Sequence, residues 1–190
     1  MISLPGRLIL ASASPRRREL LEGLGIEIEI VPSAYPEPAI PSATPQQLAM
    51  IHSLEKARDV AKKYPGRVVL AADTVVDIDG EALGKPRDAA EAKLMLKRLA
   101  GRRHEVHTGF AIVRDQRCIA ECSSTEVEMY PLSDAEIAEY VATGDPLDKA
   151  GSYGIQGRGA ANIVGVTGDY FTVVGLPIAL VVRALKKMCG

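Results

Sequence analysis

The hydrophobic positions of the chain alternate between short apolar runs and longer stretches with helical spacing. The short or alternating runs predict β-strands at residues 7–11, 26–31, 67–78, 81–83, 104–113, 117–130 and 170–174. Apolar residues recurring every three or four positions predict helices that begin at residues 15, 45, 89, 134 and 177. Residues 145–168 are rich in glycine and are predicted to be irregular, apart from a short helix after residue 157. Because helices and strands alternate at first and long strands follow, we expect an α/β fold with a mixed twisted sheet flanked by helices.

Capping residues support these helix boundaries. Residues that cap a helix start, or that suit its first turn, occur as four pairs: Ser14 with Pro15, Thr44 with Gln47, Asp88 with Glu91, and Ser133 with Glu136. Residues that stop a helix follow at Gly25, Pro65-Gly66, Gly101 and Gly144. The last three pairs have the spacing of capping boxes, so we expect reciprocal hydrogen bonds there.

The composition restricts the class of protein. The chain has 190 residues, 47% hydrophobic and 25% charged, which is typical of a globular protein, and we expect one domain over residues 1–190. A net charge of −1 argues against a general nucleic-acid binder. The three cysteines (Cys118, Cys122 and Cys189) are too few for a disulfide scaffold and are expected to be reduced. No leader opens the chain and no apolar run could span a bilayer, so we expect a cytoplasmic protein with no membrane contact.

The turn between the first strand and the first helix is the strongest candidate for function. Three consecutive arginines (Arg16, Arg17 and Arg18) occupy the first turn of the helix, where the dipole favours anions rather than cations. Helical spacing places Arg17 on the stripe of Leu20, Leu21 and Leu24, with Arg16 nearby, whereas Arg18 falls beside Glu22 on the solvent face. The alternative is a solvated basic face, which explains Arg18 better than the other two. Arginines on the buried side predict an anion bound at the turn.

Asp73 is the second candidate. It interrupts the most apolar predicted strand, between VVLAA and TVV. An unpaired buried carboxylate is costly, so it requires a cation, a metal ion or several hydrogen-bond donors. A purely structural ion pair with a nearby arginine is the alternative.

Other polar residues are weaker candidates when each is taken alone. Glu37 lies between two prolines, Lys56 lies within a helix, and Lys85 is held between Gly84 and Pro86. Each could equally be a solvated surface residue. Gln156, in a glycine-rich loop, offers both a donor and an acceptor, which suits the edge of a pyrimidine. The three histidines show no spacing typical of metal ligands. Arginines, lysines and carboxylates together suit hydrolysis of a metal-bound phosphate anhydride.

An ordered set of motifs resembles one known family. The motifs are LASASPRRRELL at 10–21, Glu37, EKA at 55–57, AADTVV at 71–76, GKPRD at 84–88, PLDKAGSYGIQG at 146–157 and VVGLP at 173–177. Together they resemble the Maf family of nucleoside triphosphate pyrophosphatases. The resemblance implies two lobes around a deep cleft, similar to the inosine triphosphate pyrophosphatase architecture, and a homodimer. It also implies hydrolysis of a nucleoside triphosphate to the monophosphate and pyrophosphate with Mg²⁺ or Mn²⁺.

The resemblance also assigns roles to residues. It implies that Asp73 is the general base and a metal ligand, and that Glu37 binds the metal or positions water. It implies that the triphosphate is held by Ser12, Arg17, Lys56 and Lys85, and we expect Ser14 of the same turn to contribute to substrate binding. Because the loop before Glu37 reads SAYPE, it lacks an acidic residue that the family often carries.

Three positions separate the branches of this family by substrate. Here they are Arg16, Thr74 and Gln156, a combination that resembles the dTTP/UTP pyrophosphatase branch. The 7-methyl-GTP branch has an aromatic residue, a glutamine and a glutamate instead, and a carboxylate suits a cationic methylated guanine. We therefore expect dTTP and UTP, with modified pyrimidine nucleotides as further substrates. The alternatives are a 7-methyl-GTP pyrophosphatase and a nucleotide-binding regulator of septum formation.

Overall fold

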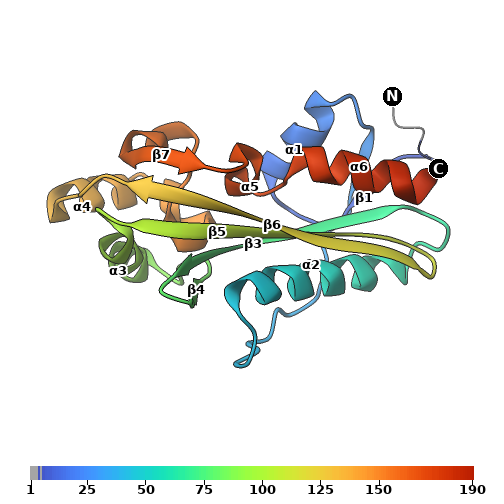
Figure 1. Cartoon of the computed structure of the whole chain (residues 1–190), viewed down its shortest axis with the longest axis horizontal. Coiled ribbons are helices and arrows are strands. Elements are labelled where there is room, and N and C mark those ends of the chain that lie inside the picture. The colour runs from blue at the N-terminus through green and yellow to red at the C-terminus, as the bar shows by residue number, and fades with distance from the viewer. Residues whose placement is uncertain (1–3, 5) are drawn as a thin grey trace.

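The computed structural model describes residue 4 and residues 6–190 and has a mixed seven-stranded sheet as its centre (Figure 1). Its strands follow the order β2-β1-β3-β5-β6-β7, and β4 pairs with β3 off this path. Their bounds are β1 Leu8–Leu10, β2 Ile28–Ile30, β3 Val69–Ile78, β4 Glu81–Leu83, β5 Arg103–Arg114, β6 Arg117–Met129 and β7 Ile163–Thr167. β1 runs parallel to β2 and β3, and the other pairs are antiparallel. The predicted mixed α/β sheet is thus confirmed.

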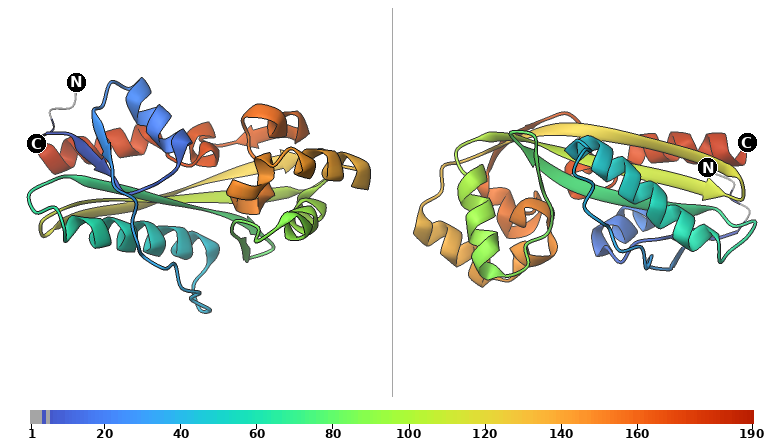
Figure 2. Two further views of the ribbon diagram at one scale, coloured as in Figure 1. Left: turned by 180° about the vertical axis from the view of Figure 1, so that it is seen from behind. Right: turned by 90° about the horizontal axis from the view of Figure 1, so that it is seen from below.

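Helices cover both faces of the sheet and gather at its two ends (Figures 1 and 2). The helices are α1 Pro15–Gly23, α2 Pro45–Ala61, α3 Ala89–Leu99, α4 Asp134–Ala142, α5 Tyr170–Val174 and α6 Ile178–Cys189. Helices α1 and α6 bury apolar side chains such as Leu21 and Val181 on one face, while α2 buries Ala57 and Val60 on the other. Helices α3 and α4 form a separate apolar cluster at the far end of the long strands. None of the helices in the described part of the chain has the length and apolar character needed to cross a membrane.

The predicted caps explain where most helices begin. α2 and α4 start with complete capping boxes at Thr44 and Ser133, as predicted. The Asp88 carboxylate caps α3, but the predicted box is wrong. The Glu91 carboxylate instead accepts hydrogen bonds from Arg87, at 2.6 Å from its backbone N–H. Ser14 occupies the N-cap position of α1 without a capping hydrogen bond from its side chain.

One predicted element is wrong near the end of the chain. Residues 170–174, expected to be a strand, form the short helix α5, and the last strand is β7. Asp169 caps α5 by accepting from the backbone N–H groups of Phe171 and Thr172, and Gly175 ends it with φ +116°. The β-branched residues of this segment favoured a strand, but the local caps at both of its ends decide for a helix. The predicted short helix after residue 157 is confirmed as η3, Gly157–Asn162, which follows η1, Asp145–Asp148, and η2, Ala150–Ser152.

The central strand β3 has an open stretch along one edge. β1 pairs with it only at Val69 and Leu70, and β4 begins to pair at Val76. Residues 72–75 therefore have no partner strand on this edge within the described residues. The apolar clusters also separate here, because Ala72 belongs to one cluster and Val76 to another. Polar side chains can occupy this position in the sheet without breaking the apolar core.

Candidate active site

Asp73 and Thr74 lie in this open stretch and point to opposite faces of the sheet. Asp73 faces α2, and Thr74 faces α1, since these are the helices their side chains contact. The Asp73 carboxylate is buried, with the residue 8% exposed. The sequence indicated that such a carboxylate needs a partner, and the structure supplies Lys56 of α2.

Asp73 is paired with a lysine that it shares with a second carboxylate. The Lys56 ammonium lies 2.7 Å from Asp73 Oδ1 and 2.8 Å from Glu37 Oε1. The side chains of Lys56 and Asp73 are only 13% and 12% exposed, so water screens this contact poorly. Glu37 reaches the lysine from the proline-rich loop with φ +51°, a left-handed backbone that is strained for a non-glycine residue.

A glycine allows α2 to bring Lys56 this close to the sheet. An added Cβ at Gly109 of β5 would overlap the backbone of Ala49 and Met50 in α2. Gly109 is also the cross-strand partner of Asp73. Gly109 was not among the residues predicted from the sequence, although a glycine inside an apolar strand is a known signal of close backbone approach.

Arg17 is held by three acceptors from different segments. Its guanidinium donates to the Gly175 carbonyl at 2.8 Å, to Ser12 Oγ at 2.9 Å and to Thr74 Oγ1 at 3.1 Å. Burial lowers the pKa of Arg17 from its ordinary value, and the negative charge of Asp73 acts in the opposite direction. An arginine retains its proton at neutral pH, so a fixed positive charge lies at the turn between β1 and α1.

Behind Arg17 lies a chain of threonine hydroxyls. Thr74 Oγ1 lies 2.9 Å from Thr108 Oγ1, and Thr108 donates to the Thr172 carbonyl at 2.7 Å. Thr108 is fully buried. The Thr74 hydroxyl is thus occupied by Arg17 and Thr108, which makes it a support for the guanidinium. Nothing in the local sequence around Thr108 pointed to this contact, because it joins segments distant in the chain.

Gly175 packs closely against Thr74 and Arg17, and this contact yields a prediction. Its φ of +116° and a distance of 3.3 Å from an added Cβ to Thr74 Oγ1 both disfavour a side chain. Gly175→Ala is expected to lower the free energy of unfolding by about 1–3 kcal/mol and to reduce activity, because Arg17 must shift. Denaturant unfolding and turnover measure the two effects. Gly165→Ala in β7 is the control, since an added Cβ there meets nothing within 4 Å. Equal losses in both variants would contradict the prediction.

Arg16 contacts the glycine-rich segment that follows α4. Its guanidinium lies 3.1 Å from Asp148 Oδ2 in η1, and Asp148 is also bound by Lys149 at 2.7 Å. Burial acts to raise the pKa of Asp148, but the hydrogen bonds from Lys149 and Arg16 dominate and lower it. Arg18, by contrast, lies near Glu22 with both side chains about half exposed, as predicted for a solvent-facing residue.

Lys85 and Gln156 lie on exposed loops. Lys85 follows β4, where the Gly84 carbonyl accepts a hydrogen bond from the Gly151 N–H at 3.0 Å, so the two predicted loops are neighbours. The carbonyl of Gln156 and the side chain of Lys149 both lie near Gly154. Neither Lys85 nor Gln156 makes a side-chain hydrogen bond within the described part of the chain, so both can turn toward a ligand.

The predicted metal ligands converge on one point. Oxygen atoms of Glu37 and Asp73 lie within 2.8 Å of the same ammonium nitrogen, which shows that their positions suit a shared cation. Carboxylate oxygens are the ligands that Mg²⁺ and Mn²⁺ prefer. The residues therefore fit a divalent ion that shares these carboxylates with Lys56.

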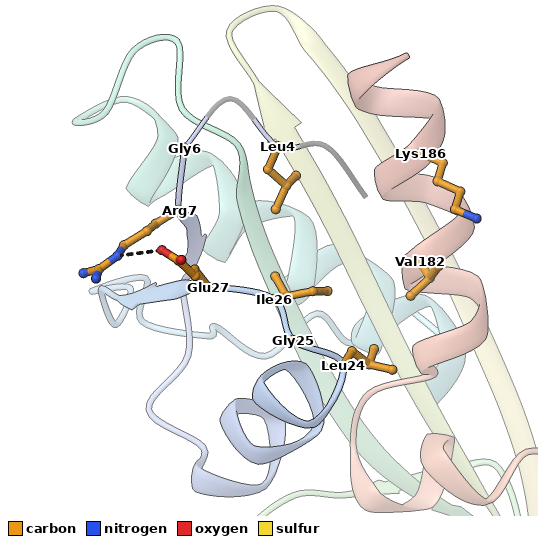
Figure 3. Close-up of a pocket in the computed structure, with 9 residues that line it drawn as sticks. All are labelled: Leu4, Gly6, Arg7, Leu24, Gly25, Ile26, Glu27, Val182 and Lys186. Atoms are coloured by element: carbon orange, nitrogen blue, oxygen red, sulfur yellow. Dashed lines mark hydrogen bonds and ion pairs between the residues drawn. The ribbon is translucent and has the colours of Figure 1, made fainter. Parts of the chain in front are cut away.

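A hollow in the surface lies away from these residues. It has a volume of about 620 Å³ and is lined by residues that follow α1, such as Leu24 and Ile26, and by Val182 and Lys186 of α6 (Figure 3). None of the predicted site residues lines it. The chemistry is concentrated instead at the open edge of β3.

The fold and the site together define a class of protein: a mixed α/β protein that gathers cationic side chains and paired carboxylates around one strand. Over residues 7–188 the chain matches the family described as Maf-like protein, and it belongs to this Maf family.

Relatives in this family are similar to the chain over almost their whole length. The dTTP/UTP pyrophosphatase of Symbiobacterium thermophilum is 50% identical over 181 residues, covering 95% of this chain and 93% of the relative. That of Bacillus cytotoxicus is 48% identical, covering 95% of both chains. Among solved structures, the Staphylococcus aureus Ham1 protein has a TM-score of 0.46 at 14% identity, covering 83% of this chain and 80% of that one. Protein VC0702 from Vibrio cholerae has a TM-score of 0.42 at 12% identity, covering 73% and 77%.

Proposed function

We propose that this protein hydrolyses dTTP and UTP to the nucleoside monophosphate and pyrophosphate with the help of Mg²⁺ or Mn²⁺. The observation that carries the proposal is that Arg17 contacts Thr74 while Lys56 and Glu37 gather at the neighbouring Asp73, so a cation and a carboxylate cluster approach the open edge of β3 from its two faces. The proposal is supported by the relatives, which are named dTTP/UTP pyrophosphatase and match this chain over almost its whole length.

Asp73 is the proposed general base. Lys56 contacts its Oδ1, and Oδ2 has no partner among the described residues, so Oδ2 can accept a proton from water. The water oxygen forms a bond to the α-phosphorus as the bridging bond to the β-phosphate breaks, and pyrophosphate leaves. Glu37 and Asp73 would hold a divalent ion, which would supply charge neutralisation at the phosphate oxygens. Lys56 keeps the two carboxylates together between turnovers.

The cations around the turn are proposed to hold the triphosphate. Arg17 is pre-oriented by its three acceptors, so little reorganisation is needed when charge develops on the leaving pyrophosphate. Arg16 and Lys85 approach from the solvent side, and Ser12 and Ser14 offer hydroxyl and backbone donors in the turn. The Arg16 guanidinium is then shared between Asp148 and substrate.

Gln156, with Arg16 and Thr74, is proposed to favour a pyrimidine. A neutral amide donates to and accepts from a uracil or thymine edge without requiring a charge on the base. Because Thr74 is bound to Arg17 and Thr108, its part in this preference is to position the arginine.

A panel of nucleoside triphosphates, scored by pyrophosphate release with Mg²⁺, tests the function directly. Turnover of dTTP and UTP above purine nucleotides and 7-methyl-GTP is the expected result. Tight dTTP binding without turnover in Mg²⁺ or Mn²⁺ would contradict the proposal and favour a regulator.

Gln156→Glu is expected to shift the preference toward 7-methyl-GTP. The new carboxylate attracts the cationic base and repels the carbonyl edge of uracil, so the ratio of kcat/KM values for dTTP and 7-methyl-GTP should fall at least about tenfold, equivalent to about 1.4 kcal/mol. Gln116→Glu, in the exposed turn between β5 and β6, is the control. An unchanged ratio would remove Gln156 from base recognition.

We further propose a cytoplasmic homodimer, following the family resemblance. Light scattering on the purified protein should give about twice the chain mass of 20.3 kDa. A monomeric mass would refute this part of the proposal without affecting the catalytic one.

A further inference from the structure

A second group of potential ligands lies on the same sheet face as Asp73, four residues further along β3. Asp77 of β3 faces Glu105 of β5 across the strands, and His107 is two residues along β5 from Glu105. At the rise of a β-strand, this group is about 13 Å from Asp73. None of the roles proposed above uses these three residues.

The imidazole of His107 is directed at both carboxylates. Its Nε2 lies 3.3 Å from Asp77 Oδ2 and 3.6 Å from Glu105 Oε2, and one ligand atom from each of the three residues lies within 4.8 Å of the others. Charge-assisted hydrogen bonds are shorter, at about 2.7–2.9 Å. Ligand atoms around one ion, with bonds of about 2.1 Å, lie about 3.0–3.4 Å apart. The 3.3 Å between His107 Nε2 and Asp77 Oδ2 falls within this range, and a small shift of the exposed Glu105 side chain would bring its carboxylate to the same ion.

A contact on the other ring nitrogen fixes the orientation of the His107 imidazole. Its side chain is only 5% exposed, and its Nδ1 lies 2.7 Å from Ser124 Oγ of β6. A hydrogen bond to the second ring nitrogen is the usual support of a metal-binding histidine, because it sets the ring orientation and leaves the other nitrogen to the metal.

The surrounding charges also favour a cation. Asp77, Glu105 and Glu126 stand side by side across β3, β5 and β6, on one face and in register. Like charges directly opposite one another destabilise a sheet. Among the described residues, the ion pairs of these three carboxylates are those with His107 and with Arg103, the latter 3.4 Å from Glu126. The negative charge of this row thus exceeds the positive charge that faces it.

We propose that Asp77, Glu105 and His107 bind a divalent transition-metal ion such as Mn²⁺ or Zn²⁺, separate from the catalytic ion. The imidazole ligand favours these ions over Mg²⁺. The ion joins β3 to β5 next to the catalytic strand and offsets the repulsion within the carboxylate row. This site does not depend on the proposed function, since it uses no residue of the nucleotide site.

The test is a Mn²⁺ titration of the full chain without nucleotide, following the electron paramagnetic resonance signal of free Mn²⁺. It uses Asp73→Asn as the background, so that binding at the catalytic carboxylates is weakened. We expect the remaining site to be lost, or weakened at least tenfold, on adding Glu105→Gln or His107→Gln. Mn²⁺ should also raise the Tm of the Asp73→Asn protein and not that of the double variants.

Glu128→Gln is the matched control, because it removes a carboxylate from the same face that is bound instead to Arg103 at 3.1 Å. It should leave Mn²⁺ binding unchanged. The Glu105 side chain is 58% exposed, so its replacement does not disturb the core. If His107→Gln fails to fold, Mn²⁺ binding by the Glu105→Gln variant alone tests the proposal. Equal Mn²⁺ affinity in the Asp73→Asn protein and its Glu105→Gln derivative would overturn the proposal, whatever the result for dTTP hydrolysis.

Discussion

Replacing Asp73 by asparagine is expected to reduce kcat for dTTP by roughly 10²–10⁴-fold, the usual contribution of a general base. The amide keeps the size of the side chain but cannot take the proton from water. It also removes one of the two carboxylates that face Lys56 and that are proposed to hold the divalent ion. Pyrophosphate release at saturating dTTP measures the effect.

The control for this variant is Asp79→Asn in the turn that follows the same strand. Asp79 has an exposed side chain and a φ of +57°, which asparagine tolerates well. Its activity should match that of the wild type. Circular dichroism must show that Asp73→Asn folds. Wild-type turnover in a folded Asp73→Asn protein would remove Asp73 from the mechanism.

Arg17→Lys is expected to lower kcat/KM for dTTP by roughly 10²–10³-fold, as loss of a pre-oriented donor does elsewhere. The charge is retained, but an ammonium has no planar fork to reach Gly175, Ser12 and Thr74 together. The positive charge then moves about the turn and stabilises the leaving pyrophosphate less well. Steady-state kinetics of pyrophosphate release give the value.

Arg18→Lys is the matched control for this substitution. It lies next in the chain and on the same helix, but its guanidinium is exposed and lies 3.7 Å from Glu22. The control should retain wild-type kinetics. Similar losses in the two variants would show that the helix tolerates no lysine here, and would refute a specific role for Arg17.

Most of the secondary structure followed from local patterns. Strand alternation located β5 and β6 to within about a residue, and the capping boxes at Thr44 and Ser133 placed α2 and α4. The failures have local causes as well. The segment 170–174 is rich in residues that favour strands, yet Asp169 and Gly175 cap it as a helix. β7 was missed because its short run is half exposed and interrupted by Gly165.

The candidate site was only partly accessible from the residues themselves. Arg17 and Asp73 stood out because each breaks a local rule: a cation at the positive end of a helix, and a carboxylate in an apolar strand. Glu37, Lys56 and Lys85 break no such rule, so only the family resemblance selected them. Thr108 and Gly109 were missed, since their contacts join strands to segments more than thirty residues away.

The sequence by itself determined the order of elements as far as α4, the placement of Arg17 on the inner side of its helix and the need of Asp73 for a partner, because these depend on periodicity, caps and the cost of burying charge. Only the tertiary structure decided which partner each group has. Pairing of β1 and β4 with different parts of β3 leaves the edge at residues 72–75 open, and the packing of α2 against Gly109 brings Lys56 to Asp73. Such contacts depend on how distant segments pack, which no local pattern records.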